Sequence, residues 1–284
     1  MTQEPTPFPA QGDDWNNLAD EYVKLTNGAI NAPCETLLSK ANALFPFSTA
    51  SAILDNGSGP GPVMNRLITT YGASIPSTCQ LTCADFSTGM LAGCQHQKDS
   101  ASAESPWKRV ELLEQNAMAL VSVPSTSYSH VLAGFVYFMT QDPGKCLAES
   151  KRVLQPGGVL ALSSWESSEW IDVMGLVSVV RPDKVVPALR EEWRRDGLLA
   201  EQVRKAGFRD VEVVRVPTVM ALQSYESGAE MFMGKMPHMV MLMKDVTKEE
   251  KAKVREVMIE KLKVLCPTVP GHLNGMALVA VGRK

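Results

Sequence analysis

The sequence predicts an α/β fold in which a mainly parallel β-sheet is covered by helices on both faces. The first reason is alternation: short apolar runs at residues 52–54, 80–84, 110–113, 130–134 and 159–163 alternate with helical stretches, as in successive βαβ units. The second is a glycine cluster directly after the first run, where such folds turn from strand into helix. The third is composition, because 284 residues that are 45% apolar can bury a substantial core.

The N-terminal part is expected to be a tail followed by a helical lid. Residues 1–12 are polar and contain three prolines, so we predict a flexible tail there. From residue 13 to about 44 the pattern is helical, with Trp15, Leu18, Ala19 and Tyr22 at the spacing of one helix face. Pro33 at most opens a second helix. The predicted lid spans residues 13–46.

The core is expected to span residues 47–216 and 272–284. Helices are predicted at 63–71, through Met90 and Leu91, at 143–154 and at 191–206, the last ending at Gly207 as a C-cap. The Pro-Gly-Gly sequence at 156–158 predicts a turn before the fifth strand. Strands at 211–216 and 276–281 complete the sheet.

An insert over residues 217–271 is predicted to form a helical cap. About sixty residues separate the last two predicted strands, far more than a hairpin loop needs. The insert holds a methionine-rich stretch at 231–243 and a capping box, Thr247 with Glu250, that predicts a helix start. An insert of this size on an α/β core is expected to cover the site.

Charge, hydropathy and cysteine usage exclude several classes of protein. The 28 basic and 31 acidic residues leave a net charge of −3, and no basic patch indicates a nucleic-acid partner. No apolar run reaches the ~18 residues of a membrane span, and the first residues do not resemble a signal peptide. We therefore expect a cytoplasmic protein. Cys79, Cys83, Cys94 and His96 could be drawn as a zinc set, but two of these cysteines fall on a predicted buried strand, so no metal is expected.

The glycine cluster is the most informative segment. Asp55 ends the first predicted strand, and Gly57, Gly59 and Gly61 alternate after it. Glycines there allow close approach of the backbone to a ligand, while the following helix offers free N–H groups. The third glycine comes one residue too early for a dinucleotide motif, and no lysine follows for a P-loop. A tight turn without a ligand is the alternative.

Polar residues follow the next two strands. Asp85 ends the second strand, beside the glycine loop in such sheets, where a carboxylate can accept hydrogen bonds from a ribose diol. Asn116 and Met118 follow the third strand and could contact the edge and face of an adenine. The alternatives are structural: Asp85 as a helix cap, and Asn116 as a turn residue.

The order of these motifs resembles that of the class I S-adenosylmethionine-dependent methyltransferases. The resembling stretches are Leu54-Asp55-x-Gly57-x-Gly59-x-Gly61, Asp85-Phe86-Ser87-x-x-Met90-Leu91, Asn116-Ala117, Arg152-Val153-Leu154-x-Pro156-Gly157-Gly158 and Ala206-Gly207-Phe208. Tyr128-Ser129-His130-Val131, Ser163-Ser164-Trp165 and Trp170-Ile171 are similar to the gliotoxin bis-thiomethyltransferase type of fungal specialised metabolism. The resemblance implies a Rossmann-like fold with a seven-stranded, mostly parallel sheet, and S-adenosyl-L-methionine as cofactor.

The resemblance also implies roles for matching positions. Tyr22 would close over the cofactor, Asp55, Gly57 and Gly59 would hold its methionine part, Asp85 its ribose, Phe86, Asn116, Ala117 and Met118 its adenine, and Gly134 and Phe135 would approach its amine. Packing within the N-terminal helix is the alternative for Tyr22. His130 stands where the wider family often has an aspartate, so we expect it to pack on the scaffold.

The substrate is predicted to be a small apolar metabolite. Trp165 and Trp170, with Met233, Met236 and Met239 of the insert, could line an apolar pocket, although core packing is the alternative for the methionines. No catalytic residue is assigned, and His238 is the one candidate base in the cap. The resemblance favours methylation of a thiol in an epidithiodiketopiperazine-like compound. O- or N-methylation, a methyltransferase-like cyclase or pericyclase, and a non-catalytic regulator remain alternatives.

Overall fold

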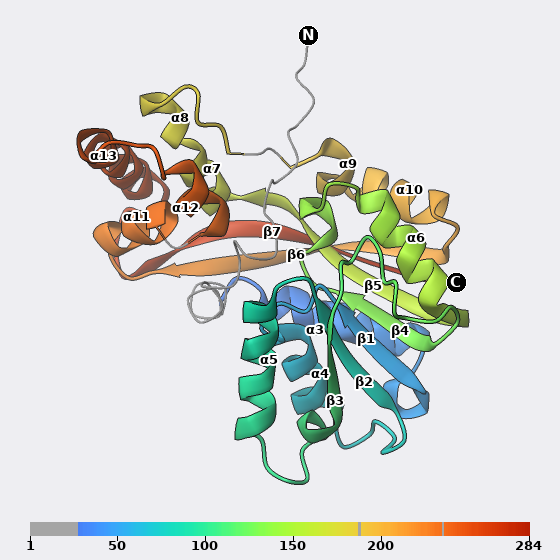
Figure 1. The fold of residues 1–284 in the computed structure, drawn as a ribbon. Coiled ribbons are helices and arrows are strands. Elements are labelled where there is room, and N and C mark those ends of the chain that lie inside the picture. The colour runs from blue at the N-terminus through green and yellow to red at the C-terminus, as the bar shows by residue number, and fades with distance from the viewer. Residues whose placement is uncertain (1–27, 187–188, 235) are drawn as a thin grey trace.

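The architecture is a single seven-stranded sheet with helices on both faces (Figure 1). The computed structural model describes residues 28–186, 189–234 and 236–284, and of Pro237 and His238 only the backbone. The strands are β1 (Ala52–Asn56), β2 (Gln80–Asp85), β3 (Val110–Glu114), β4 (Tyr128–Ala133), β5 (Leu154–Ser168), β6 (Arg209–Leu222) and β7 (Gly271–Arg283). Their order is β3-β2-β1-β4-β5-β7-β6, and only β7 runs antiparallel to its neighbours. The predicted fold class is confirmed.

Helices cover the sheet and extend beyond it. They are α3 (Asn31–Leu44), α4 (Pro62–Tyr71), α5 (Thr88–Ser100), α6 (Pro143–Val153), α7 (Glu169–Gly175), α8 (Val177–Val180), α9 (Glu191–Arg194), α10 (Asp196–Lys205), α11 (Tyr225–Gly234), α12 (Pro237–Leu242) and α13 (Lys248–Leu265), with short 3₁₀ turns η1 (Phe47–Thr49), η2 (Pro106–Arg109) and η3 (Tyr137–Met139). Strand order reverses direction at β1, and right-handed crossovers therefore place α4 and α5 on one face and α6 on the other.

The described half of the predicted lid is a core helix. Residues 31–44 form α3, which packs along β5, β6 and β7. Leu37, Leu38 and Ala41 on its inner face are fully buried, and the Arg283 guanidinium donates to the Leu44 carbonyl at 2.6 Å. Pro33 lies in the first turn of this helix, as tolerated there. Tyr22 lies outside the described residues.

Two predicted local features are wrong. The Pro-Gly-Gly sequence at 156–158 lies inside β5, where Gly157 takes a φ of 79° and its N–H donates to the Lys284 carbonyl. The helix predicted at 191–206 is two helices, α9 and α10, with extended backbone at Arg195 between them. Just before the break, the Trp193 side chain is buried and the Trp193 carbonyl accepts a 2.7 Å hydrogen bond from the Ser164 hydroxyl.

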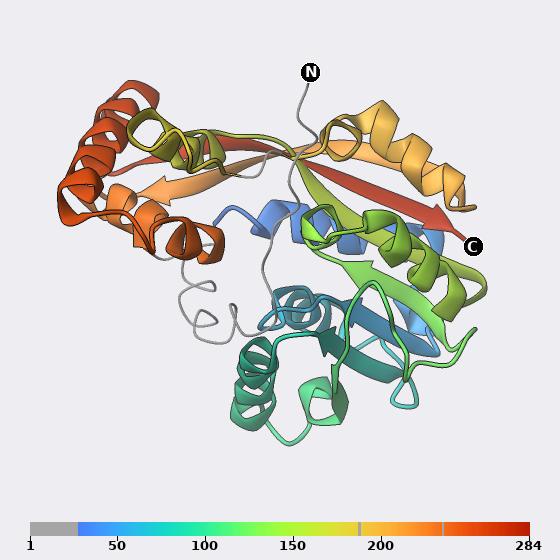
Figure 2. The same cartoon turned by 45° about the horizontal axis from the view of Figure 1, so that its top comes forward.

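The last two strands are longer than predicted and carry the helices of the insert. β6 and β7 pair antiparallel from Arg209 with Arg283 to Leu222 with Gly271. The helices α11, α12 and α13 lie together at the far end of this pair (Figure 2). The predicted capping box at the start of α13 is confirmed, since Thr247 and Glu250 exchange side-chain and backbone hydrogen bonds. Within the described residues, no helix has the length and apolarity to cross a membrane.

Candidate cofactor and substrate site

The glycine loop joins β1 to α4 in a conformation that favours glycine at each position. Gly57, Gly59 and Gly61 have φ values of 75°, 54° and 87°, in the left-handed region that other residues enter only at a cost. A Cβ on Gly57 would lie 2.5 Å from Val136, whereas a Cβ on Gly59 would meet no described atom within 4 Å. The loop therefore has open space beside Gly59, as a cradle for a ligand requires.

Asp55 is a buried carboxylate with an unused acceptor. Its Oδ2 accepts a 3.1 Å hydrogen bond from the Met64 N–H. Among the described residues, only its Oδ1 and the Oδ1 of Asn56 are buried side-chain atoms without a hydrogen-bond partner. Burial raises the pKa of Asp55 to about 7, against the Met64 hydrogen bond that lowers it, and the nearby Asp85 carboxylate raises it further. Such a site favours a donor-bearing, positively charged ligand group.

This raised pKa predicts a change in the pH dependence of stability when Asp55 is replaced by asparagine. The native carboxyl keeps its proton between about pH 4 and pH 7 while the unfolded one loses it, so Asp55 makes the free energy of unfolding fall as pH rises through this range. A difference of one bound proton between the folded and unfolded states changes the free energy of unfolding by ~1.4 kcal/mol per pH unit. Asp55→Asn should remove this negative slope, as measured by urea unfolding without ligand over that range.

His130 makes the free energy of unfolding rise with pH, opposite to the contribution of Asp55. This positive slope should become visible once Asp55→Asn removes the negative one. Its Nδ1 lies 2.9 Å from the Ser129 hydroxyl and its Nε2 lies 2.8 Å from the Phe45 carbonyl. Burial lowers the pKa of His130 to about 4, so the unfolded state binds the extra proton and stability rises from about pH 4 to pH 6.5. If the free energy of unfolding changes with pH identically in wild type and Asp55→Asn, the raised pKa of Asp55 is contradicted. Because both ring nitrogens face scaffold atoms, His130 packs on the scaffold as expected.

Asp85 links the glycine loop to the second strand. Its Oδ2 accepts from the Gly59 N–H at 2.8 Å and its Oδ1 from the Ser87 N–H at 3.0 Å. A carboxylate offers about four acceptor sites, so a ribose hydroxyl could still bind beside the backbone N–H groups of Gly59, Ser87 and Phe86. Burial raises the pKa of Asp85, partly offset by these backbone hydrogen bonds. The helix cap that sequence reasoning weighed for Asp85 is instead Ser87, whose hydroxyl accepts from the Met90 N–H at the start of α5.

The segment after β3 lies at the same edge as Asp85. The Cα atoms of Asp85 and Glu114 are register partners, and the Gln115 N–H donates to the Asp85 carbonyl at 2.9 Å. Asn116 is exposed and closes a small turn, its Oδ1 accepting from the Met118 N–H at 2.9 Å. The structure thus brings the predicted ribose and adenine residues together. Phe86 is 40% exposed beside them, Ala117 is buried and Met118 is half-buried.

An aromatic wall begins where β4 ends. A Cβ on Gly134 would lie 2.6 Å from Val63, so only glycine permits this approach to α4. Phe135 has a φ of 56°, which is unusual for a bulky residue, and its N–H donates to the Ser163 hydroxyl at 3.0 Å. Its ring stacks on Trp165 at 4.2 Å, and Trp165 meets Trp170 edge-on at 5.1 Å. The three rings, hereafter the aromatic wall, are buried and run from the end of β4 to β7, where a Cβ on Gly275 would lie 2.4 Å from Trp170.

The methionines of the insert have mixed environments. Met239 is fully buried, and Met233 and Met236 are half-buried and pack against the core. The side chain of His238 lies outside the described residues. In the described part of the chain all six cysteines are free and buried, and no group of three potential metal ligands occurs. Cys94 instead donates its thiol to the Gly59 carbonyl at 3.2 Å.

Sequence reasoning missed a buried polar chain behind the first strand. The Asn56 amide donates to the Tyr137 hydroxyl at 2.9 Å, which lies 2.6 Å from the Ser150 hydroxyl. This arrangement fixes the amide so that its Oδ1 is left as an acceptor without a described partner. The only signal in the sequence was a second polar residue, directly after Asp55, at the end of a buried strand.

The described residues fit S-adenosylmethionine. Its sulfonium and ammonium charges match the unused acceptors at the end of β1, its ribose diol matches the Asp85 carboxylate, and its adenine matches the exposed segment at Asn116. The open space beside Gly59 provides room for close contact with the backbone. The groups that fit the cofactor lie at the carboxyl ends of three neighbouring strands, β1, β2 and β3.

Comparisons with known proteins identify the family. The family described as "Methyltransferase domain" matches residues 54–162. The methyltransferase ucsB of an Acremonium species is 37% identical over 275 residues, covering 96% of this chain and 95% of that protein. The acetylaranotin bis-thiomethyltransferase of Aspergillus terreus is 26% identical over 178 residues, covering 60% of this chain and 58% of that protein.

Solved structures show the same fold at low sequence identity. A phosphoethanolamine N-methyltransferase from Haemonchus contortus in complex with S-adenosyl-L-methionine is 16% identical with a TM-score of 0.53, covering 95% of this chain and 57% of that chain. The [4+2]-cyclase SpnF is 17% identical with a TM-score of 0.55, covering 99% of this chain and 96% of that chain. The strand order, the loop geometry and the full-length relative together place the chain among the class I S-adenosylmethionine-dependent methyltransferases of fungal secondary metabolism.

Proposed function

We propose that the protein transfers the methyl group of S-adenosylmethionine to a thiol of a small apolar metabolite, of the epidithiodiketopiperazine type once its disulfide is reduced. The observation that carries the proposal is the aromatic wall, a buried and apolar stack of rings that starts at Phe135 beside the proposed cofactor amine. The thiol is favoured by the similarity to the acetylaranotin bis-thiomethyltransferase.

Each group of residues has a defined part in this reaction. When bound, S-adenosylmethionine supplies an already activated methyl group. Asp85 and the Asn116 segment hold the nucleoside, while Asp55 and the glycine loop orient the methionine end. The aromatic wall excludes water and aligns the substrate. A thiol with a reference pKa of ~8.5 is partly ionised near neutral pH and needs less help from a base than a phenol at ~10.

The test is methyl transfer to a matched panel of substrates. Reduced dithiols should give mono- and bis-S-methylated products, with one S-adenosylhomocysteine formed per methyl group. The corresponding cyclic disulfide, incubated without reductant, should give none, and this arm is the control for the nucleophile. Methylation of phenols or amines in preference to the dithiols would overturn the choice of sulfur. Substrate turnover that leaves S-adenosylmethionine unconsumed would overturn methyl transfer itself and favour a cyclase.

A further inference from the structure

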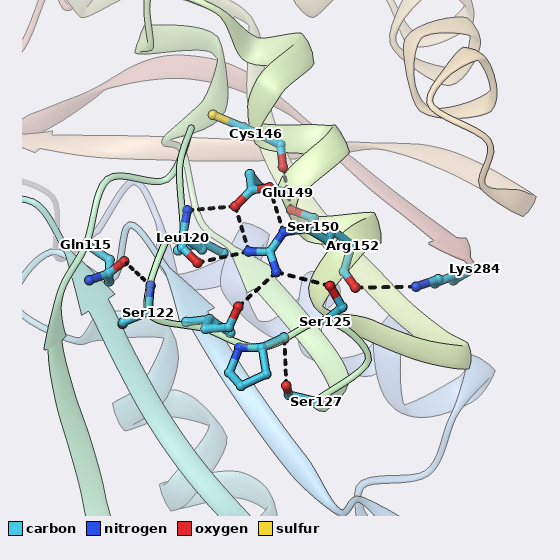
Figure 3. A network of polar contacts seen from close by, with 12 residues as sticks. Gln115, Leu120, Ser122, Ser125, Ser127, Cys146, Glu149, Ser150, Arg152 and Lys284 are labelled. Atoms are coloured by element: carbon cyan, nitrogen blue, oxygen red, sulfur yellow. Dashed lines mark hydrogen bonds and ion pairs between the residues drawn. The ribbon is translucent and has the colours of Figure 1, made fainter.

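A polar clamp joins α6 to the loop that follows β3. Its Arg152 opens one of the stretches that resemble the family, but neither Arg152 nor its partner Glu149 has a role in the site described so far. The clamp consists of Glu149 and Arg152, one helical turn apart on α6 (Figure 3). The Arg152 guanidinium pairs with Glu149 through two contacts of 2.8 Å, from Nε to Oε1 and from Nη2 to Oε2. Side-chain exposures of 34% and 20% leave both groups partly shielded from water, and the pKa of Glu149 is lowered by its hydrogen bond to Arg152.

The clamp binds both the N–H and the carbonyl of one loop residue, Leu120. The Leu120 N–H donates to Glu149 Oε2 at 2.7 Å, and the Leu120 carbonyl accepts from Arg152 Nη2 at 2.9 Å. Arg152 Nη1 also donates to the Val123 carbonyl at 2.8 Å and to the Ser125 hydroxyl at 3.3 Å (Figure 3). A planar guanidinium supplies this set of donors in a fixed geometry, which a lysine ammonium cannot reproduce.

The segment proposed to enclose the adenine ends at Met118, and Leu120 lies two residues after it. The Ala119 N–H donates to the Asn116 carbonyl at 2.8 Å, so the turn at Asn116 continues directly into the clamped residue. Asn116 itself is exposed and therefore has little packing to fix its position. The clamp is thus a polar connection between α6 and the segment that directly follows this exposed turn, where the buried Leu120 side chain also packs.

We propose that Glu149 and Arg152 are positioning residues that set how the enzyme reads the adenine edge of its cofactor. The proposal rests on the cofactor site proposed above, because it needs the adenine at Asn116–Met118. Adenine presents a donor at N6 and an acceptor at N1, whereas hypoxanthine presents the reverse pattern. A loop held in one register distinguishes these edges, since a mismatched base leaves polar groups unpaired. A loop released from the clamp loses this selectivity.

The experiment measures selectivity, which a loss of general stability does not change. S-adenosylhomocysteine and its hypoxanthine analogue, S-inosylhomocysteine, are titrated into wild type, Arg152→Gln and Glu149→Gln. We expect the wild type to prefer the adenine ligand at least tenfold and both variants to reduce that ratio at least threefold. The double variant should be no worse than Arg152→Gln, because both changes break one unit. Lys263→Gln, which breaks an i,i+3 pair with Glu260 on α13, is the matched control and should keep the ratio.

The outcomes separate this inference from the proposed cofactor site. If the wild type binds neither ligand, the cofactor site and the clamp's role in it are both wrong. If the wild type selects adenine and both clamp variants keep the same ratio, the clamp is structural only and the inference is overturned. Glu149→Gln retains an acceptor for Arg152 and is the milder change, so it carries the test if Arg152→Gln does not fold.

Discussion

Replacing Gly59 by alanine is expected to weaken S-adenosylmethionine binding at least tenfold while leaving the fold intact. The added methyl group would meet no described atom within 4 Å in the protein, so it would extend into the space where the ligand is proposed to contact the loop. The φ of 54° adds a strain of about 1 kcal/mol for any residue with a Cβ. Calorimetric titration and thermal unfolding of the same sample separate the two effects.

Gly157→Ala is the matched control for this change. Gly157 also has a positive φ, 79°, and a Cβ there would likewise meet no described atom within 4 Å. It lies in β5 beside the chain end at Lys284, away from the glycine loop. Both variants should lose similar stability, and only Gly59→Ala should lose affinity. Equal affinity in the two variants would contradict the placement of the cofactor at the loop.

Replacing Asp85 by alanine is expected to lower the affinity for the cofactor more than any other change proposed. The change removes the proposed acceptor for the ribose and also the acceptors of the Gly59 and Ser87 N–H groups. Leaving a buried donor unpaired costs roughly 1–3 kcal/mol, so the glycine loop should loosen as well. We expect affinity to fall more than tenfold, which corresponds to ~1.4 kcal/mol. Asp85→Asn retains a carbonyl acceptor and should lose less.

A neighbouring carboxylate provides the control for charge. Glu114 is the register partner of Asp85 on β3 and is exposed. Glu114→Ala removes a negative charge from the same edge of the sheet and leaves the hydrogen bonds of Asp85 in place. We expect a change of less than about threefold, since an exposed charge is screened by solvent. A loss equal to that of Asp85→Ala would indicate a charge effect instead of specific contacts.

The parallel half of the sheet could be predicted because its signals are local. Each buried strand there is a short apolar run bounded by turn residues, and Asp55 and Asp85 fall at neighbouring carboxyl ends. The extension of β6 could not be predicted in the same way, because Pro217 interrupts the apolar pattern. The structure places β6 at the sheet edge, where proline is tolerated. Around Pro217 the strand alternates: Val216, Thr218 and Met220 are buried, and the residues between them are exposed.

The parts of the site that could not be predicted depend on contacts between distant segments. Asn56 meets Tyr137 across 81 positions of sequence, and Glu149 meets the Leu120 backbone across 29. Neither pairing leaves a spacing pattern in the chain. The division of the helix at Arg195 has a similar origin, since Trp193 is held by Ser164 from β5. Tertiary contacts override local propensity at these positions.

The central claim is that the glycine loop and Asp85 bind S-adenosylmethionine, and its most direct test is calorimetric titration of wild type and Asp85→Ala. S-adenosylmethionine and its demethylated product are each titrated into folded protein, with circular dichroism recorded on both samples. We predict micromolar binding of both ligands to wild type and a loss of more than tenfold in Asp85→Ala. Folded wild-type protein that binds neither ligand, or equal affinity in the two proteins, would contradict the claim.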